Sequence, residues 1–400
     1  MRRYFRFGKL GLIDASGNHH QICDLEGPTV VLRITDNSIV RRLLTSSSTS
    51  WGEAYTNGQL LFEQGSLIDF LEIYSRSEFQ FSLTWPGRAM RRIYSFLAIT
   101  QHFNSVGRAQ SNAEHHYDLS AELYDQFLDT DRQYSCGYFP RGDEDIDTAQ
   151  LLKKRHIAAK LDIRPGMQVL DIGSGWGGMA LYLAKHLDCH VSGVTLSEKQ
   201  YKLSNQRALE EGLEDRVKFE MRDYRSLERP FDRIVSVGML EHVGQFHLRE
   251  YFKQVRNLLK PEGVALIHTI TRMDKPQPIS AWTRKYIFPG AYVPAASQLA
   301  DAIENAHLWL TDLENLRCHY AHTLQRWHQR FAENRDKVVK LYDERFYRMW
   351  EMYLLSSETS FRYQNYTVFQ MQITRDINTL PITRDYQLQA EQALAEKDNE

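Results

Sequence analysis

Several features that often reveal a protein's function are scarce in this sequence. The four cysteines, Cys23, Cys136, Cys189 and Cys318, form no CxxC pair, which argues against a disulfide scaffold. No apolar run approaches the roughly 20 residues of a membrane span, and no apolar stretch of a signal peptide follows the charged N-terminus. The 49 basic and 51 acidic residues nearly cancel, so the charge does not indicate a nucleic-acid partner. We therefore expect a reduced cytoplasmic protein that binds no nucleic acid.

Aromatic residues, by contrast, are plentiful at 12% of the chain. Their rings fill protein cores, but they also line apolar ligand pockets and membrane interfaces. Residues 1–110 carry 12 basic and 9 acidic residues, so this segment is positive while the remainder of the chain is negative. Composition alone does not decide between a large core and an apolar binding site.

Residues 88–97 have the spacing of an amphipathic helix within this positive segment. Such a helix either packs its apolar stripe on a core, which the pattern alone favours, or lies on an anionic membrane surface. The expected apolar face comprises Met90, Ile93, Tyr94 and Leu97, and the opposite face comprises Arg88, Arg91 and Arg92.

From residue 150 onward, predicted strands and helices alternate. This βαβ order predicts an α/β fold with a mostly parallel sheet and helices on both of its faces. From about residue 302 we expect only helices, including one long charged helix over 324–355. The expected strands are 168–172, 190–195, 217–219, 233–237 and 264–269. The expected helices before residue 302 are 151–161, 179–186 and 248–259.

A glycine-rich turn, Asp171-Ile172-Gly173-Ser174-Gly175-Trp176, follows the first of these strands and opens a helix. Gly173 and Gly175 let the backbone turn sharply and approach a ligand without an obstructing Cβ. NAD-dependent enzymes use similar turns, so the glycines alone are weak evidence. Asp171 would repel a pyrophosphate but suits the cationic amino-acid end of S-adenosylmethionine, which we therefore predict as the cofactor.

The residues after the next two strands complete the predicted cofactor site. The second strand lacks the carboxylate that usually binds the ribose hydroxyls at its tip. Thr195, Ser197 and Gln200 would hold the ribose there with hydroxyl and amide groups. Asp223 and Tyr224 follow the third strand, where Asp223 could accept a hydrogen bond from the adenine amine or serve only as a turn residue.

Further segments resemble the cyclopropane-fatty-acyl-phospholipid synthase family, in the order of that family and over nearly the whole chain. They are Gly52-Glu53-Ala54-Tyr55 with Gly58, Gln133 to Phe139, Val237 to Gly244, Leu266 to Ile270, Trp282 and Lys285 to Gly290. Mycolic-acid cyclopropane synthases share the core but lack the long N-terminal segment. The resemblance implies a Rossmann-like class I methyltransferase domain over 111–400, with helical additions, and a smaller α+β lipid-binding domain over 1–110.

The reaction implied by the resemblance adds the methyl carbon of S-adenosylmethionine to a cis double bond of an acyl chain. Proton loss from the resulting carbocation closes the cyclopropane ring, and no activated protein nucleophile is needed because the alkene itself attacks. In the family, a bound bicarbonate is the base. Its ligands carry over to Cys136, Glu241, His268, Ile270 and Tyr320, with Cys136 and Ile270 contributing backbone groups.

The same resemblance implies the cofactor residues and the partners. Tyr134 and Ser135 would cover S-adenosylmethionine beside the loop formed by Gly173, Ser174, Gly175 and Trp176. The substrate would be an unsaturated phospholipid in a bilayer, met by a homodimer attached peripherally to the cytoplasmic side of the inner membrane. No metal site is expected, because Glu241, His242 and His247 lack zinc-ligand spacing.

One position departs from the family pattern. Ser357 stands where relatives commonly carry a cysteine, shortly before Phe361-Arg362. A serine hydroxyl does not replace a thiolate, but the bicarbonate ligands already account for the base. Loss of a different proton would give a methyl- or methylene-branched chain. The sequence is also consistent with a methyltransferase for a soluble metabolite and with a non-catalytic lipid-binding paralogue.

Overall fold

The computed structural model describes residues 4–45, 48–82, 84 and 121–398. The boundary expected near residue 110 and the amphipathic helix expected over 88–97 lie outside these residues. The chain forms two compact units, and neither is continuous in sequence, which the expected pair of consecutive domains did not anticipate. The first unit comprises residues 1–101, 277–289 and 321–366, and the second comprises 102–276, 290–320 and 367–400.

The second unit is built on a seven-stranded sheet in the order β10-β11-β9-β8-β5-β6-β7. The pairs β5–β6, β6–β7, β5–β8 and β8–β9 are parallel, and β10 and β11 pair antiparallel. The strands are β5 (Gln168–Ile172), β6 (His190–Thr195), β7 (Val217–Met221), β8 (Phe231–Val237), β9 (Leu259–Arg272), β10 (Trp309–Asn315) and β11 (Tyr366–Thr374).

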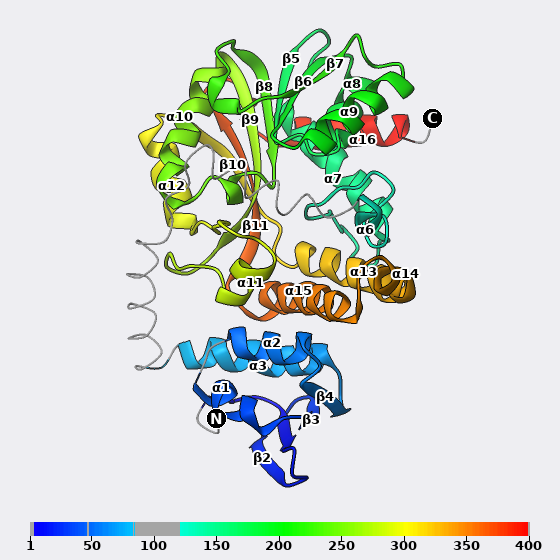
Figure 1. Ribbon diagram of the computed structural model, residues 1–400. Coiled ribbons are helices and arrows are strands. Elements are labelled where there is room, and N and C mark those ends of the chain that lie inside the picture. Colours follow the sequence, from blue (N-terminus) through cyan, green and yellow to red (C-terminus); the bar gives the residue numbers. More distant parts are fainter. Residues whose placement is uncertain (1–3, 46–47, 83, 85–120, 399–400) are drawn as a thin grey trace. The chain divides into compact units, whose positions relative to one another are not determined.

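Helices cover both faces of this sheet, as the βαβ order predicts (Figure 1). The helix α10 shows why: Leu248, Tyr251, Phe252, Val255 and Leu258 recur at helical spacing and are all buried. One core contains this stripe and the buried residues of α12, and the other contains residues of α7, α8, α9 and α16. The helices are α6 (Ala121–Tyr124), α7 (Ile146–Leu161), α8 (Gly178–Leu187), α9 (Glu198–Glu210), α10 (Leu248–Leu258), α12 (Ala296–Asn305) and α16 (Asp385–Lys397).

The prediction for the C-terminal region is wrong in two respects. The expected long helix over 324–355 is three helices: α13 (His319–Glu333), α14 (Arg335–Leu341) and α15 (Glu344–Tyr363). The break before α15 occurs because Asp343 is extended and its carboxylate accepts a hydrogen bond from the N–H of Phe346 at 2.6 Å, a helix N-cap. The region is also not wholly helical, since β10 and β11 complete the sheet.

The first unit contains a four-stranded sheet in the order β2-β1-β3-β4, with helices that pack together around α2, α3 and α15. No helix of the described residues is both long enough and apolar enough to cross a membrane. The strands are β1 (Lys9–Ile13), β2 (His19–Asp24), β3 (Thr29–Ile34) and β4 (Leu60–Gln64), and the helices are α1 (Val40–Thr45), α2 (Ser48–Thr56), α3 (Leu67–Ser82), α11 (Ala281–Tyr286), α14 and α15.

The family-like segment around Glu53 has a structural role within this unit. The Glu53 carboxylate accepts hydrogen bonds from the Lys285 ammonium and the Tyr286 hydroxyl, both at 2.8 Å. A Cβ on Gly52 would lie 2.5 Å from the indole of buried Trp282. The segment therefore fastens α2 to α11, although the two helices are more than 200 residues apart in sequence.

Candidate active site

A glycine-rich turn connects β5 to α8 at the carboxyl edge of the sheet. Gly173, Gly175 and Gly177 have φ angles of 79°, 54° and 88°, which residues with a Cβ rarely adopt. Strand β5 lies between β8 and β6, so the strand order reverses there. Open α/β sheets bind ligands outside the strand ends at such a reversal. The turn is therefore in the position expected for a cofactor loop.

A pocket opens beside this turn, and all of the residues predicted to bind the cofactor line it. They come from four parts of the sequence that the sheet brings together. These residues are Tyr134, Ser135, Gly173, Ser174, Gly175, Trp176, Thr195, Ser197, Gln200, Asp223 and Tyr224.

Two buried oxygen atoms in the pocket fit the amino-acid end of S-adenosylmethionine. Asp171 Oδ2 and Ser174 Oγ are buried and have no hydrogen-bond partner among the described residues. Burial raises the pKa of Asp171 to about 7, although the charge of Lys153 opposes this rise. A cationic amine bound beside Asp171 would stabilise its carboxylate, so these residues suit the predicted cofactor.

This arrangement predicts that S-adenosylmethionine binding depends on pH. A cation beside Asp171 lowers the pKa of that carboxyl, so binding releases a proton at pH 6 and strengthens as the pH rises through 7. For a pKa near 7, the affinity should increase about fivefold between pH 6 and pH 7. Isothermal titration calorimetry in buffers of different ionisation enthalpy measures both the affinity and the proton release. Asp171→Asn should remove both effects, and equal wild-type affinities at pH 6 and pH 7 would contradict the assignment.

The three residues predicted to hold the ribose also hold one another. The Thr195 hydroxyl donates to Oε1 of Gln200 at 2.8 Å, and Ser197 caps α9 by accepting from the N–H of Gln200 at 3.4 Å. Because Oε1 of Gln200 is engaged, its amide nitrogen is the group directed to other acceptors. Among the described residues that line the pocket, Asp171 and Asp223 are the carboxylates, so β6 contributes none.

Asp223 has the turn role that the sequence suggests for it, and its position in the pocket is consistent with the predicted ligand role. It lines the pocket, and it also caps a short 3₁₀ helix by accepting from the N–H of Arg225 at 2.9 Å. Its second oxygen accepts from the Arg225 guanidinium at 2.7 Å. Burial opposes ionisation of Asp223, but these bonds from Arg225 hold its pKa below the ordinary value. Asp223 is therefore an anchored carboxylate that keeps lone pairs for a further donor.

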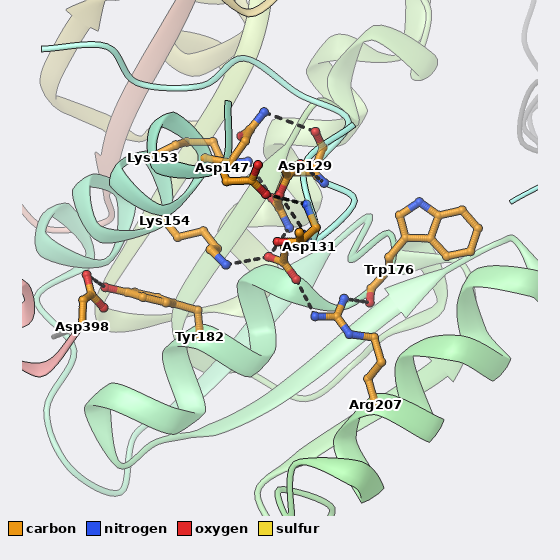
Figure 2. Close-up of polar contacts among 12 residues, drawn as sticks. Asp129, Asp131, Asp147, Lys153, Lys154, Trp176, Tyr182, Arg207 and Asp398 are labelled. Carbon is orange, nitrogen blue, oxygen red and sulfur yellow. Dashed lines mark hydrogen bonds and ion pairs between the residues drawn. The ribbon is translucent and has the colours of Figure 1, made fainter. Parts of the chain in front are cut away.

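An ion cluster centred on Asp131 joins Lys154 and Arg207 close to Trp176 (Figure 2). Asp131 accepts from Lys154 at 2.5 Å and from Arg207, and Arg207 also donates to the backbone oxygen of Trp176 at 2.8 Å. A Cβ on Gly178 would lie 2.5 Å from Oδ1 of Asp131, so any larger residue here would displace the Asp131 carboxylate. The cluster therefore ties α7, α9 and the glycine turn to one carboxylate.

A buried lysine continues this cluster toward the sheet. Lys153 donates to Oε1 of Gln133 at 2.6 Å and to the Ser135 hydroxyl at 2.9 Å. Burial lowers its pKa to about 8, while nearby carboxylates oppose that change. Its charge lowers the pKa of both Asp171 and His268, so Lys153 lies near enough to influence the cofactor pocket and one predicted bicarbonate ligand.

Sequence reasoning missed several residues that line the pocket. Gln133 directly precedes the predicted Tyr134, and His242 directly follows the predicted Glu241, so neighbouring positions offered a signal for both. Burial lowers the pKa of His242 to about 4, so this ring is neutral near pH 7. Arg222 and Arg225 flank the predicted Asp223 and Tyr224, and Met239 lies within the family-like segment Val237 to Gly244, so the sequence offered a signal for these pocket residues as well.

Glu241, a predicted bicarbonate ligand, is a buried carboxylate with one open oxygen. Its Oε1 accepts from the backbone N–H of Ile270 at 2.5 Å, whereas Oε2 is buried without a partner among the described residues. Burial raises the pKa of Glu241 to about 7, and the Ile270 N–H opposes that rise. The N–H of Ile270 is thus already engaged, so Ile270 positions Glu241 instead of offering that group to an anion.

His268 lies two residues before Ile270 on β9 and is also buried. Burial and the charges of Lys153, Lys160 and His156 lower its pKa well below the ordinary value. The imidazole is therefore neutral near pH 7 and has one N–H to donate. A neutral imidazole that donates one N–H would suit an anion that carries its own proton.

The structure brings the segments of Cys136 and Tyr320 together. The His319 ring stacks on Tyr138, with centroids 5.0 Å apart, and its Nδ1 accepts from the N–H of Phe139 at 2.8 Å. Cys136 is buried, and a negative charge on its thiol raises the pKa of nearby Lys153. Of the predicted bicarbonate ligands, Glu241 thus contacts Ile270 directly, and His268 lies on the same strand as Ile270. Cys136 and Tyr320 lie on two other segments, which His319 joins.

Comparisons with known proteins identify the family. The model for mycolic acid cyclopropane synthetase matches residues 104–371. The chain belongs to this family. Cyclopropane-fatty-acyl-phospholipid synthase of Escherichia coli K12 is 36% identical over 354 residues, covering 88% of this chain and 90% of the relative. Tuberculostearic acid methyltransferase UfaA1 of Mycobacterium tuberculosis is 32% identical over 393 residues, covering 94% of this chain and 90% of the relative.

Solved structures confirm the predicted fold of this family member. Mycolic acid cyclopropane synthase CmaA1, complexed with SAH and CTAB, is 30% identical with a TM-score of 0.63, covering 66% of this chain and 97% of that one. Coclaurine N-methyltransferase has a TM-score of 0.67 at 18% identity over 81% of this chain and 98% of that one, which shows a shared fold. The protein is therefore an S-adenosylmethionine-dependent methyltransferase of the cyclopropane-synthase type, with a Rossmann-like catalytic fold.

Proposed function

We propose that the protein converts a cis double bond in an unsaturated phospholipid acyl chain into a cyclopropane ring. The observation that carries the proposal is the buried oxygen of Glu241 that has no partner within the described part of the chain, on the sheet edge that also carries the S-adenosylmethionine pocket. When bound, S-adenosylmethionine supplies the electrophilic methyl group, and bicarbonate supplies the base. The relationship to the E. coli phospholipid synthase supports this substrate class.

The residues of the chain have separable tasks in this proposal. Asp171 and Asp223 bind the two ends of S-adenosylmethionine, and the glycine turn allows its close approach. Glu241 accepts a hydrogen bond from the O–H of bicarbonate, and His268 and Tyr320 donate to its oxygens. Glu241 and His268 are buried, and this burial excludes water, which would otherwise trap a carbocation as an alcohol.

The phospholipid reaches this site from a membrane surface in the same proposal. The basic excess of residues 1–110 suits attraction to anionic headgroups. A strictly water-soluble acceptor would give that segment no evident purpose. Peripheral attachment to the cytoplasmic face of the inner membrane and a homodimeric state belong to this proposal through the family resemblance.

A methyl- or methylene-branched product is the second candidate. Two observations favour it: Ser357 lies partly buried on α15 where relatives commonly carry cysteine, and UfaA1 is named as a methyltransferase. A changed environment for the carbocation would direct proton loss to a different carbon without altering cofactor binding.

A product assay tests the proposal. The purified protein is incubated with S-adenosylmethionine and vesicles of cis-unsaturated phospholipid, with bicarbonate present or removed, and the fatty esters are examined by mass spectrometry and proton NMR. A bicarbonate-dependent gain of one CH₂ with upfield ring protons is expected. The same mass with vinylidene protons, or with a methyl branch on a retained double bond, would favour the second candidate. No mass gain while the cofactor still binds would overturn the synthase function on this substrate.

A further inference from the structure

A chain of buried polar groups lies behind His268, on the side occupied by β11. Gln370, on β11, places its amide between His268 and Lys160. The Lys160 ammonium lies 2.8 Å from Oε1 of Gln370, and Nε2 of Gln370 lies 3.2 Å from Nδ1 of His268. All three side chains are at most 2% exposed, so these contacts are not exchanged with bulk water.

The chemistry of lysine determines which way this amide faces. An ammonium has three N–H donors and no acceptor, so the Gln370 atom that contacts Lys160 must be the oxygen. The Gln370 amide nitrogen therefore faces His268 and donates to Nδ1. A neutral imidazole that accepts at Nδ1 carries its proton on Nε2. Its Nε2–H is then the group that His268 can donate.

Lys160 is itself held in place by a charged pair. Its ammonium contacts the Glu314 carboxylate, which also lies 2.6 Å from Nε2 of His156. The other ring nitrogen of His156 lies 2.5 Å from Glu391. Burial alone would lower the pKa of His156, but its two carboxylate partners raise it. Two cations and two carboxylates thus compensate one another, and the ammonium remains directed at Gln370.

We propose that Gln370 and Lys160 are positioning residues that fix His268 in the Nε2–H form, as a hydrogen-bond donor to the anion held beside Glu241. The inference rests on the proposed function, because the anion is the bicarbonate named there. The open oxygen of Glu241 then accepts from the anion's O–H while His268 donates to another of its oxygens. Together the two side chains select a protonated, singly charged oxyanion.

Nitrogen-15 NMR of the histidine-labelled protein tests the tautomer without any turnover. The His268 signals are assigned by their loss in His268→Asn. The wild-type protein should show a protonated Nε2 and an unprotonated Nδ1. In Gln370→Glu the new carboxylate accepts both from Lys160 and from His268, so Nδ1 should become protonated and Nε2 should lose its proton. A protonated Nδ1 in the wild-type protein would overturn the inference.

Kinetics then test the consequence for the anion. With phospholipid vesicles, Gln370→Glu should raise the bicarbonate concentration for half-maximal rate at least tenfold, with the KM for S-adenosylmethionine unchanged within twofold. The matched control is Gln372→Glu, a buried glutamine on the same strand whose amide bonds the Lys160 backbone oxygen and Tyr386. It should leave the bicarbonate dependence within twofold of wild type.

The outcomes separate this inference from the function on which it rests. Wild-type activity that does not depend on bicarbonate would overturn the bicarbonate role and this inference together. A bicarbonate-dependent wild-type enzyme whose Gln370→Glu variant keeps the same half-maximal concentration would overturn the inference alone. An equal rise in Gln370→Glu and Gln372→Glu would also overturn it, because added charge on β11 would then be the cause.

Discussion

Glu241→Gln should lower kcat by about 100-fold or more, while S-adenosylmethionine still binds. Glutamine preserves the shape of the side chain and can keep the bond from the Ile270 N–H to its oxygen. Its NH₂ group would replace the open oxygen Oε2 and would oppose the O–H of bicarbonate, donor against donor. Glu241 does not line the cofactor pocket, so calorimetry should give the wild-type affinity for S-adenosylmethionine.

The catalytic role of Glu241 also predicts the direction in which the rate changes with pH. Because burial raises the pKa of Glu241 to about 7, the carboxylate needed to accept a hydrogen bond forms only as the pH rises through that value. The wild-type rate should therefore climb between pH 6 and pH 8. Glu250→Gln, the same change on the exposed face of α10, serves as the control and should leave kcat within twofold. A Glu241→Gln enzyme within fivefold of the wild-type rate would refute the catalytic assignment.

Gly175→Asn should weaken S-adenosylmethionine binding by about 100-fold while the protein remains folded. A Cβ on Gly175 would meet no atom of the described residues within 4 Å, so the new side chain would enter the pocket that this residue lines. Asparagine tolerates the left-handed conformation better than other residues with a Cβ, and the strain is about 1 kcal/mol. Titration calorimetry measures the affinity, and thermal unfolding checks the fold.

Gly212 offers a control with the same backbone strain. Its φ of 64° is close to the 54° of Gly175, and a Cβ there also meets nothing within 4 Å. Gly212 does not line the pocket. Gly212→Asn should therefore lower the melting temperature as much as Gly175→Asn but change the affinity less than twofold. Equal affinities in the two variants would mean that Gly175 does not face the cofactor.

The parallel part of the sheet was readable from the sequence, and the antiparallel part was not. The runs 168–172 and 190–195 match β5 and β6 residue for residue, because each has buried β-branched or aliphatic residues, such as Val169 and Val191, bounded by turn residues. Strand β11 buries Thr367, Gln370 and Gln372. Because these polar residues interrupt its apolar ones, the hydrophobic pattern of the sequence does not predict a buried strand there. Strand β10 exposes Trp309, which breaks the expected alternation.

The residues that line the cofactor pocket could be predicted from the sequence, but the long-range ion pairs that hold them could not. The glycine turn and the strand tips indicated where ligand groups would meet, because parallel strands end at a common edge. The spacing of Gly173, Gly175 and Gly178 also occurs in dinucleotide-binding turns, so it was Asp171 that distinguished the two cofactors. The bond between Asp131 and Arg207 joins residues 76 positions apart, and no local pattern announces such a pair.

The discontinuity of the two units has a consequence for synthesis on the ribosome. The first unit needs residues 321–366 to be complete, and the sheet of the second unit lacks β11 until residue 374 has been added. The leading 101 residues therefore emerge long before the helices that pack against them within the same unit, with part of their apolar surface still open. Domains that are continuous in sequence fold one after another during translation. Here neither unit is complete before residue 366 has been added, so both units finish folding late in translation or after it.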